Sequence, residues 1–374
     1  MPTNWSALTA GGKPYLTVSP GATSSSGADY GSDTSLTQTN GIYEALVQAN
    51  SNAVGTTSGP ARVFLLPGTF AIKSPVTINF ASNASVELVG SGKASILQPQ
   101  SNVDVIQLTA PSGSGNSLRK IRLADFQILD NLSGFQQTST GGIFLNPSNN
   151  QINELIIERV SMYNTYYGIY SEDLSSNQAA SIQTAAFSRI RINNYRYVGF
   201  QLFNFFDSVL DDIYCQQAGG VSTVLDGFQL YNSGFTSQGP ASGSFGVNLK
   251  ALGQSGSTKY GTGFSVSKMR DLQLMNCHAD SYWLGYSTNN QCDRVHYYSV
   301  GSINNSGDGC YVNHSSGWVF FFAVVCEGNA GWGVKNYGQT NGNMAIFNSA
   351  MSSNTSGSIH TATGDVTYNT LGST

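Results

Sequence analysis

Seven short segments of this chain share one pattern, a glycine followed by alternating apolar residues. Most of them follow another short alternating strand by 12 to 14 residues, so each repeat supplies at least two strands. This recurrence predicts stacked β-coils, because a single coil cannot bury its own apolar face. The segments are GGIFL from Gly141, GIYS from Gly168, GFQLF from Gly199, GFQLY from Gly227, GYS from Gly285, GCYV from Gly309 and GWGV from Gly331.

The composition fits one elongated β-rich domain. A chain of 374 residues is long for a single core, but each coil of a repeat protein packs only on its neighbours. Charged residues make up 10% of the chain, well below the roughly 25% of ordinary soluble domains. The net charge of −4 and the scattered cations argue against nucleic acid as a partner, and no segment is apolar enough to span a membrane.

Five cysteines are present, and no pair has the spacing of a zinc site or a CxxC motif. We therefore expect no metal and no cofactor, and we expect buried free thiols. The start of the chain lacks the basic and apolar regions of a secretory signal. The cysteines are Cys215, Cys277, Cys292, Cys310 and Cys326.

The chain divides into an irregular N-terminal arm, residues 1–38, and a solenoid domain, residues 39–374. Within 40–50, apolar residues recur at helical spacing, and Thr39 or Asn40 is available to cap the first turn. A helix here would cover the first coil and protect its strand edges from aggregation.

The opening of the domain resembles the pectate-lyase-like parallel β-helix superfamily. The resemblance is carried by ADYGSD (28–33), the helix NGIYEALVQA and the strand pair RVFLLPGTFAI (62–72). It departs from the superfamily at Asn40, where an aspartate is usual, and at Ser58-Gly59-Pro60, which replaces a glycine pair. The resemblance implies a right-handed, single-stranded parallel β-helix with an N-terminal helical cap, as in phage tailspikes, epimerases and many polysaccharide-degrading enzymes.

Two stretches interrupt the strand rhythm. Residues 233–264 are rich in glycine and serine and double the usual spacing between repeats. We expect a protruding loop or hairpin there, although one extra coil would also fill the gap. Residues 340–374 are polar with weak strands, which is typical of a C-terminal cap or a contact between subunits.

RDLQL (270–274) and DRVHY (293–297) align at an offset of 23 residues. Adjacent coils about 4.8 Å apart would then place Arg270 beside Asp293 and Asp271 beside Arg294. The reciprocal exchange of charge predicts two ion pairs between coils and not a catalytic site.

The densest group of acidic residues is Asp211, Asp212 and Asp226. A glycosidase needs two carboxylates about 5 to 9.5 Å apart, one protonated and one ionised. If the protein is an enzyme, we expect Asp211 and Asp226 to be this pair and Asp212 to assist. The alternative is that all three are solvent-facing turn residues. The polygalacturonase motifs NTD and GHG are absent, which argues against that reaction.

An aromatic strip follows on later coils. Aromatic faces bind the apolar faces of sugar rings, so we expect these residues to hold a glycan, and stacking inside the solenoid is the alternative. The expected substrate-binding residues are Tyr282, Trp283, Tyr286 and Trp332, with Trp318 nearby.

Together these observations favour a tailspike-like virion or extracellular protein that binds, and in one version depolymerises, a surface polysaccharide. The resemblance implies a homotrimer, host-surface glycan as the partner and attachment to a virion through the N-terminus. Two alternatives stay open: an adhesive or structural virion protein without turnover, and a secreted polysaccharide lyase or epimerase.

Overall fold

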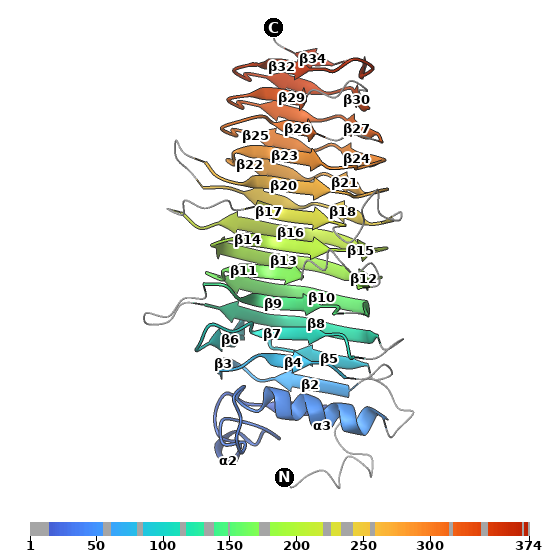
Figure 1. Ribbon diagram of the computed structural model, residues 1–374. Helices are drawn as coiled ribbons and strands as arrows, with labels where there is room; N and C mark the ends of the chain where they lie inside the picture. The colour runs from blue at the N-terminus through green and yellow to red at the C-terminus, as the bar shows by residue number, and fades with distance from the viewer. Residues whose placement is uncertain are drawn as a thin grey trace.

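The computed structural model is a long rod of stacked coils with a helix across its N-terminal end (Figure 1). It describes residues 15–54, 61–80, 85–112, 117–130, 138–148, 150–171, 180–219, 226–232, 242–254, 259–313, 317–337, 343–368 and 370–372. All strand pairs between coils are parallel, and the fold is a right-handed parallel β-helix, as the repeats predicted.

The strands form two sheets. The 11-stranded sheet, here called sheet B, receives one strand from each coil. It consists of β4 (Val76–Ile78), β7 (Ile106–Thr109), β9 (Gly141–Asn146), β11 (Tyr167–Ser171), β14 (Val198–Phe203), β17 (Asp226–Tyr231), β20 (Thr262–Ser267), β23 (Leu284–Asn289), β26 (Cys310–Asn313), β29 (Trp332–Asn336) and β32 (Gly357–His360).

The 23-stranded sheet, here called sheet A, receives from most coils one long bent strand or two short strands. It consists of β1 (Leu16–Val18), β2 (Ala61–Leu65), β3 (Gly68–Ile72), β5 (Val86–Val89), β6 (Ser95–Pro99), β8 (Leu118–Leu129), β10 (Gln151–Tyr163), β12 (Ser181–Gln183), β13 (Ala186–Tyr195), β15 (Phe205–Phe206), β16 (Val209–Gln217), β18 (Phe245–Val247), β19 (Lys250–Leu252), β21 (Gln273–Met275), β22 (His278–Asp280), β24 (Val295–Tyr298), β25 (Gly301–Ile303), β27 (Val319–Phe322), β28 (Val325–Glu327), β30 (Met344–Phe347), β31 (Ala350–Ser352), β33 (Val366–Tyr368) and β34 (Leu371–Gly372).

The bend within sheet A is made by a column of residues with left-handed backbone. Asp212, Asn248 and Asn276 have φ of 50°, 55° and 51° and lie one above another between paired strands. Asparagine and aspartate adopt this conformation more readily than other residues with a side chain, so they suit a sharp corner. The corner turns their side chains away from the core.

The repeated glycine has a steric reason. Gly168 and Gly199 occupy equivalent positions on β11 and β14. A Cβ atom on Gly168 would lie 2.3 Å from the carbonyl oxygen of Gly199 and 2.8 Å from the side chain of Ile192. Only glycine allows the coils to approach this closely, which explains why the pattern recurs.

The core is a continuous apolar column inside the coils. Phe228, Phe264 and Tyr286 stack on consecutive strands of sheet B, with ring centroids 4.7 and 4.8 Å apart. Successive coils repeat at the spacing that face-to-face rings need, so aromatic columns form naturally in this fold.

The helix expected at 40–50 is α3 (Ile42–Val54), and it covers the first coil. The hydroxyl of Thr39 accepts a hydrogen bond of 3.0 Å from the Tyr43 N–H and so caps the first turn. The preceding arm is more ordered than expected within the described residues. β1 pairs with β2, α2 (Thr23–Ser26) follows, and the side chain of Val18 is fully buried.

The stretch 233–264 also differs from the expectation. β18 and β19 pair in parallel with β16 on one side and with β21 and β22 on the other, so this stretch supplies an ordinary extra coil. Its glycine and serine content concealed short strands such as FGV and KAL. Parts of the expected loop, 233–241 and 255–258, lie outside the described residues. Strands β30 to β34 continue the coils toward the C-terminus.

The predicted ion pairs between coils are confirmed. Arg294 Nη2 lies 2.8 Å from Asp271 Oδ2, and Arg270 Nε lies 3.8 Å from Asp293 Oδ2. The five cysteines are buried free thiols, as expected. Among the helices described, none has the length and apolar character to cross a lipid bilayer.

Candidate functional site

The outward face of sheet B is the most distinctive surface of the rod. Its strands alternate, so that residues next to core positions on each strand point to solvent. Register places Tyr170, Gln201 and Gln229 in one outward column on β11, β14 and β17. This column is aromatic, amide or hydroxyl in character over most of its length. It contains Gln107, Phe144, Tyr170, Gln201, Gln229, Ser265, Ser287, Tyr311, Lys335 and His360, of which Ser265 and Ser287 are covered by their neighbours and buried.

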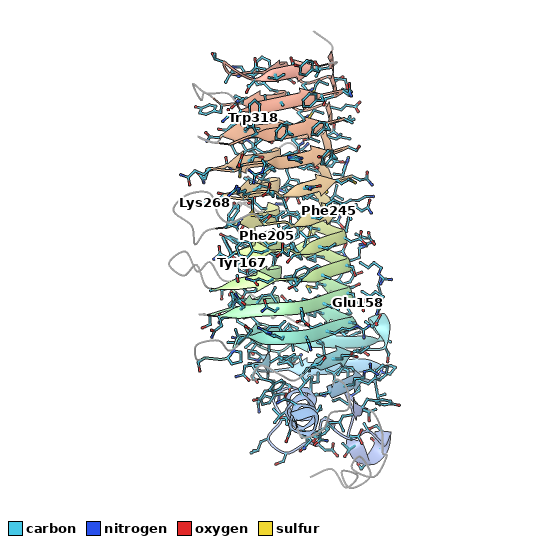
Figure 2. The ribbon with its side chains drawn as sticks, turned by 90° about the vertical axis from the view of Figure 1, so that its right-hand side faces the viewer. Glu158, Tyr167, Phe205, Phe245, Lys268 and Trp318 are labelled. Atoms are coloured by element: carbon cyan, nitrogen blue, oxygen red, sulfur yellow. The ribbon has the colours of Figure 1, made fainter. Side chains whose placement is uncertain are left out.

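Five aromatic rings lie close together on strands β9 and β11 and in the residues just before β11 and β14. Their centroids lie 4.3 to 5.2 Å apart, and every member is partly exposed. Figure 2 shows Tyr167 toward the left of the view, whereas Glu158 of sheet A lies toward the right. We call this group the aromatic cluster; it consists of Phe144, Tyr166, Tyr167, Tyr170 and Tyr197.

A carboxylate lies within the aromatic cluster. Asp104 Oδ1 accepts hydrogen bonds of 2.7 Å from the Tyr170 hydroxyl and 2.8 Å from the Gly141 N–H. Burial raises the pKa of Asp104, and the two hydrogen bonds oppose this effect only in part. Burial also raises the pKa of Tyr167, to about 12, so this hydroxyl stays protonated at neutral pH. Burial therefore favours the protonated forms of both Asp104 and Tyr167 relative to the same groups in water.

Asp226 begins β17 in the same column as Tyr167 and is 5% exposed. Its Oδ1 accepts a hydrogen bond of 2.7 Å from the Thr262 N–H, and its Oδ2 accepts one of 2.7 Å from Gln229 Nε2. Burial raises its pKa to about 6, because two hydrogen bonds compensate only partly for the lost hydration.

The two tryptophans expected to bind substrate lie on the same border of sheet B as the aromatic cluster. Trp332 shares the register column of Tyr167, and Trp283 immediately precedes Leu284 of that column. Trp283 is 54% exposed, and Trp332 is partly buried with its ring edge-to-face on His360. Both indoles therefore offer surface on the border that the aromatic cluster occupies.

Tyr282 and Tyr286 occupy different surroundings from the two tryptophans. Both are fully buried, so neither ring presents a face to a ligand outside the rod. The hydroxyl of Tyr282 bonds to that of Tyr195, and Tyr286 belongs to the interior stack. Aromatic stacking inside the solenoid, the alternative considered above, describes these two side chains.

The structure does not bring Asp211 and Asp226 together. Asp211 lies on β16 of sheet A, beside Ser188 and Val247, whereas Asp226 lies on sheet B. No hydrogen bond between described residues joins them. Asp212 lies at the corner of sheet A, where its carboxylate oxygens lie 2.8 and 2.9 Å from Arg191 Nη2. This geometry gives Asp212 a structural partner.

Sequence reasoning missed the aromatic cluster and Asp104. The run YNTYYGIY (163–170) is rich in tyrosine and is the one signal that could have drawn attention to it. Asp104 gave no such signal, because its partner Tyr170 lies 66 residues further along the chain. Within the described ranges, no group of three or more His, Cys, Asp or Glu side chains is arranged to hold a metal ion.

No protein family model matches this sequence, and no curated protein matches it either. Solved structures do resemble it. The A-module of the mannuronan C-5 epimerase AlgE6 from Azotobacter vinelandii aligns with a TM-score of 0.60 and 12% identity, over 88% of this chain and 94% of that one.

Two tailspikes are also similar. The Dettilon tailspike protein aligns with a TM-score of 0.54 and 12% identity, over 94% of this chain and 68% of that one. Tailspike protein 2 of the Escherichia coli O157:H7 bacteriophage CAB120 aligns with a TM-score of 0.52 and 11% identity, over 83% of this chain and 40% of that one. At such identities the likeness concerns the fold, and the chain has the parallel β-helix fold of these proteins.

Proposed function

We propose that this protein binds a polysaccharide along the outward face of sheet B, with the aromatic cluster as the main contact. The observation that carries the proposal is the set of partly exposed aromatic rings beside a row of amide and hydroxyl side chains. Sugar rings have apolar C–H faces and polar edges, so they bind best to surfaces that combine aromatic rings with hydrogen-bonding groups.

The dimensions of the face suit a chain ligand. Coils repeat about every 4.8 Å, so the distance from the aromatic cluster on β11 to Trp332 on β29 covers six steps, or about 29 Å. A polysaccharide lying along the rod could contact Tyr167, Trp283 and Trp332 in turn. The tailspikes and the epimerase module with similar folds support a glycan ligand as an analogy.

The proposal is tested by measuring the affinity of the wild type and of Tyr167→Ala for a panel of bacterial and plant polysaccharides. We expect Tyr167→Ala to weaken binding of the recognised glycan by about 1 to 3 kcal/mol. Tyr368→Ala is the matched control, because Tyr368 is a 57% exposed tyrosine on sheet A. Equal losses in the two variants, or no binding by the wild type, would contradict the proposal.

Glycan turnover is a second candidate, favoured by the carboxyl groups with raised pKa on this face. Burial raises the pKa of Asp104, and it raises the pKa of Asp226 to about 6, so each carboxyl group is a candidate proton donor. They are four coils apart, about 19 Å, which is too far for the carboxylate pair of a glycosidase. Asp211 and Asp212 lie on sheet A, so we propose no pairing for them.

Turnover is tested by incubating the bound glycan with the protein. New reducing ends would indicate hydrolysis, and absorbance near 235 nm would indicate an unsaturated uronate. Loss of product in Asp226→Asn or Asp104→Asn with binding retained would identify the proton donor. Binding without any product would favour an adhesive protein.

We propose that the protein is located on a virion or is extracellular. We further propose that it forms a homotrimer and is attached to a virion through its N-terminal segment. The likeness of the fold to tailspikes supports this setting. Analytical ultracentrifugation tests the homotrimer directly, because a sedimenting mass of one chain would contradict it.

A further inference from the structure

We infer that the glycan bound by sheet B is uncharged, and that polyuronates are excluded. This inference rests on the proposed function and adds the class of ligand. It is carried by an unequal distribution of charge between the two sheets. Sheet A contains most of the charged strand residues, whereas sheet B is nearly free of cations.

The strands of sheet B contain a single lysine and no arginine. That lysine, Lys335, lies 3.7 Å from Asp308 and is therefore already next to a carboxylate. By contrast, eight lysine and arginine residues lie within the strands of sheet A. They are Arg62, Arg119, Lys120, Arg122, Arg159, Arg189, Arg191 and Lys250.

The cation next to the aromatic cluster is also engaged. Arg196 connects β13 to β14 beside Tyr197, and its Nη2 lies 2.7 Å from Oδ2 of the fully buried Asp130. A guanidinium held by a buried carboxylate cannot move to a sugar carboxylate without leaving a buried charge unpaired. Arg196 therefore orders this border of the sheet, and it does not act as an anion receptor.

A polyuronate is bound best by positively charged side chains, whereas the ionisable residues along this border of sheet B are mostly carboxylates. Asp104, Asp226 and Asp308 belong to one register column, with intervals of about 19 and 14 Å along the rod. A polyuronate carries a carboxylate on every sugar. Asp226 and Asp308 are buried, at 5% and 8% exposure, so their negative charge would act on such a chain from beneath the surface and not by direct contact. This negative field disfavours the binding of a polyanion, and within the strands of sheet B the one lysine or arginine that could offset it is Lys335.

The stretches outside the described residues contain a single lysine or arginine. Of the stretches outside the described residues, only 1–14 contains a lysine or arginine, namely Lys13. The stretch 172–179, which follows β11 in the chain, contains Glu172 and Asp173.

Five of the eight cations of sheet A are already paired with carboxylates, namely Arg62, Arg122, Arg159, Arg189 and Arg191. Arg122 lies 3.6 Å from Glu87 and 2.7 Å from Glu158, and Arg62 lies 2.9 Å from Glu87. These pairs form a ladder of alternating sign across successive coils. A polyanion would have to replace existing carboxylates, which offers little gain.

The inference is tested by measuring affinity for neutral polysaccharides (pullulan, galactomannan and a neutral O-antigen) and for polyuronates (polymannuronate and polygalacturonate). At low salt we expect the recognised neutral glycan to bind about tenfold more tightly than either polyuronate. A polyuronate that binds as tightly as the best neutral glycan would overturn the inference and leave the proposed function standing. Binding of neither class would overturn both.

A variant that adds a positive charge to the face tests why polyuronates are excluded. Gln201 lies next to Tyr170 across the sheet, so Gln201→Lys places a cation on the face. We expect this change to raise the affinity for polymannuronate about fivefold, an effect that high salt removes. Gln216→Lys is the control, because Gln216 is a partly buried residue of sheet A. Equal gains in the two variants would overturn the assignment to sheet B.

Discussion

The hydroxyl oxygens of Tyr195 and Tyr282 lie 2.6 Å apart inside the rod, although 87 residues separate them in the chain. Both side chains are fully buried. Desolvation raises the pKa of each hydroxyl far above its usual range, so both stay protonated and one donates to the other. The pair joins β13 to the turn before β23 through the core.

We expect Tyr282→Phe to lower the free energy of unfolding by about 1 to 3 kcal/mol, because it leaves the Tyr195 hydroxyl buried without this partner. Removing both hydroxyls, in Tyr195→Phe/Tyr282→Phe, should cost less than the sum of the single changes. Tyr286→Phe is the control, since no described residue bonds to the buried Tyr286 hydroxyl. Denaturant unfolding measures all five proteins, including the wild type and Tyr195→Phe, and additive losses would contradict the pairing.

The raised pKa of Asp226 predicts a pH effect on stability. Between its unfolded pKa of 3.8 and its folded pKa of about 6, the folded protein holds a proton that the unfolded chain has lost. Stability from this group therefore falls as the pH rises from 4 to 6, by about 3 kcal/mol, and is constant above.

The measurement is the difference in unfolding free energy between the wild type and Asp226→Asn at pH 4, 5, 6 and 7. We expect the difference to shift in favour of the variant as the pH rises. Asp271→Asn should show the opposite trend, with most of the change below pH 4, because the hydrogen bond from Arg294 lowers the pKa of Asp271 below 3.8; measurements at pH 2 and 3 are therefore added for this variant. A pH-independent difference for Asp226→Asn would refute the assignment.

Neighbouring phenylalanines on β27 test which side of the strand faces the core. Phe321 is fully buried and stacks on Tyr297, whereas Phe322 is partly exposed and stacks on Tyr298 and Phe347. Phe321→Ala should cost about 3 to 5 kcal/mol of unfolding free energy. Phe322→Ala should cost clearly less, about 1 kcal/mol, since its ring loses fewer contacts. Thermal or denaturant unfolding that ranked them in the reverse order would contradict the register of this strand.

The ion pair between Arg294 and Asp271 should contribute little to stability. The Arg294 side chain is 42% exposed, and water screens such pairs. A double-mutant cycle with Arg294→Gln and Asp271→Asn should give a coupling of at most about 1 kcal/mol that decreases at high salt. A larger coupling that salt does not change would mean that the pair is better shielded than this exposure implies.

The coil repeat, the capping helix and the ion pairs between coils could be predicted from sequence because each depends on local periodicity. The offset of 23 residues placed Asp271 beside Arg294 because one turn of the solenoid separates them. The extra coil at β18 and β19 was only the alternative to a protruding loop, since strands of three residues carry too few alternating positions to stand out among glycines and serines.

The orientation of side chains near corners could not be predicted. Ser281 has φ of 65°, so the alternation of inward and outward residues breaks there. Tyr282 is consequently 0% exposed and Trp283 is 54% exposed, although the two are adjacent aromatic residues. Asp104 was missed for a different reason, because its environment comes from β9 and β11, in later coils.

The most direct test of the account is the structure of this protein with an oligosaccharide of the recognised neutral glycan bound. We predict that the sugar rings lie against Tyr167 and Tyr170 and that the chain continues along sheet B toward Trp283. An oligosaccharide bound to sheet A, with the aromatic cluster uncovered, would contradict the central claim.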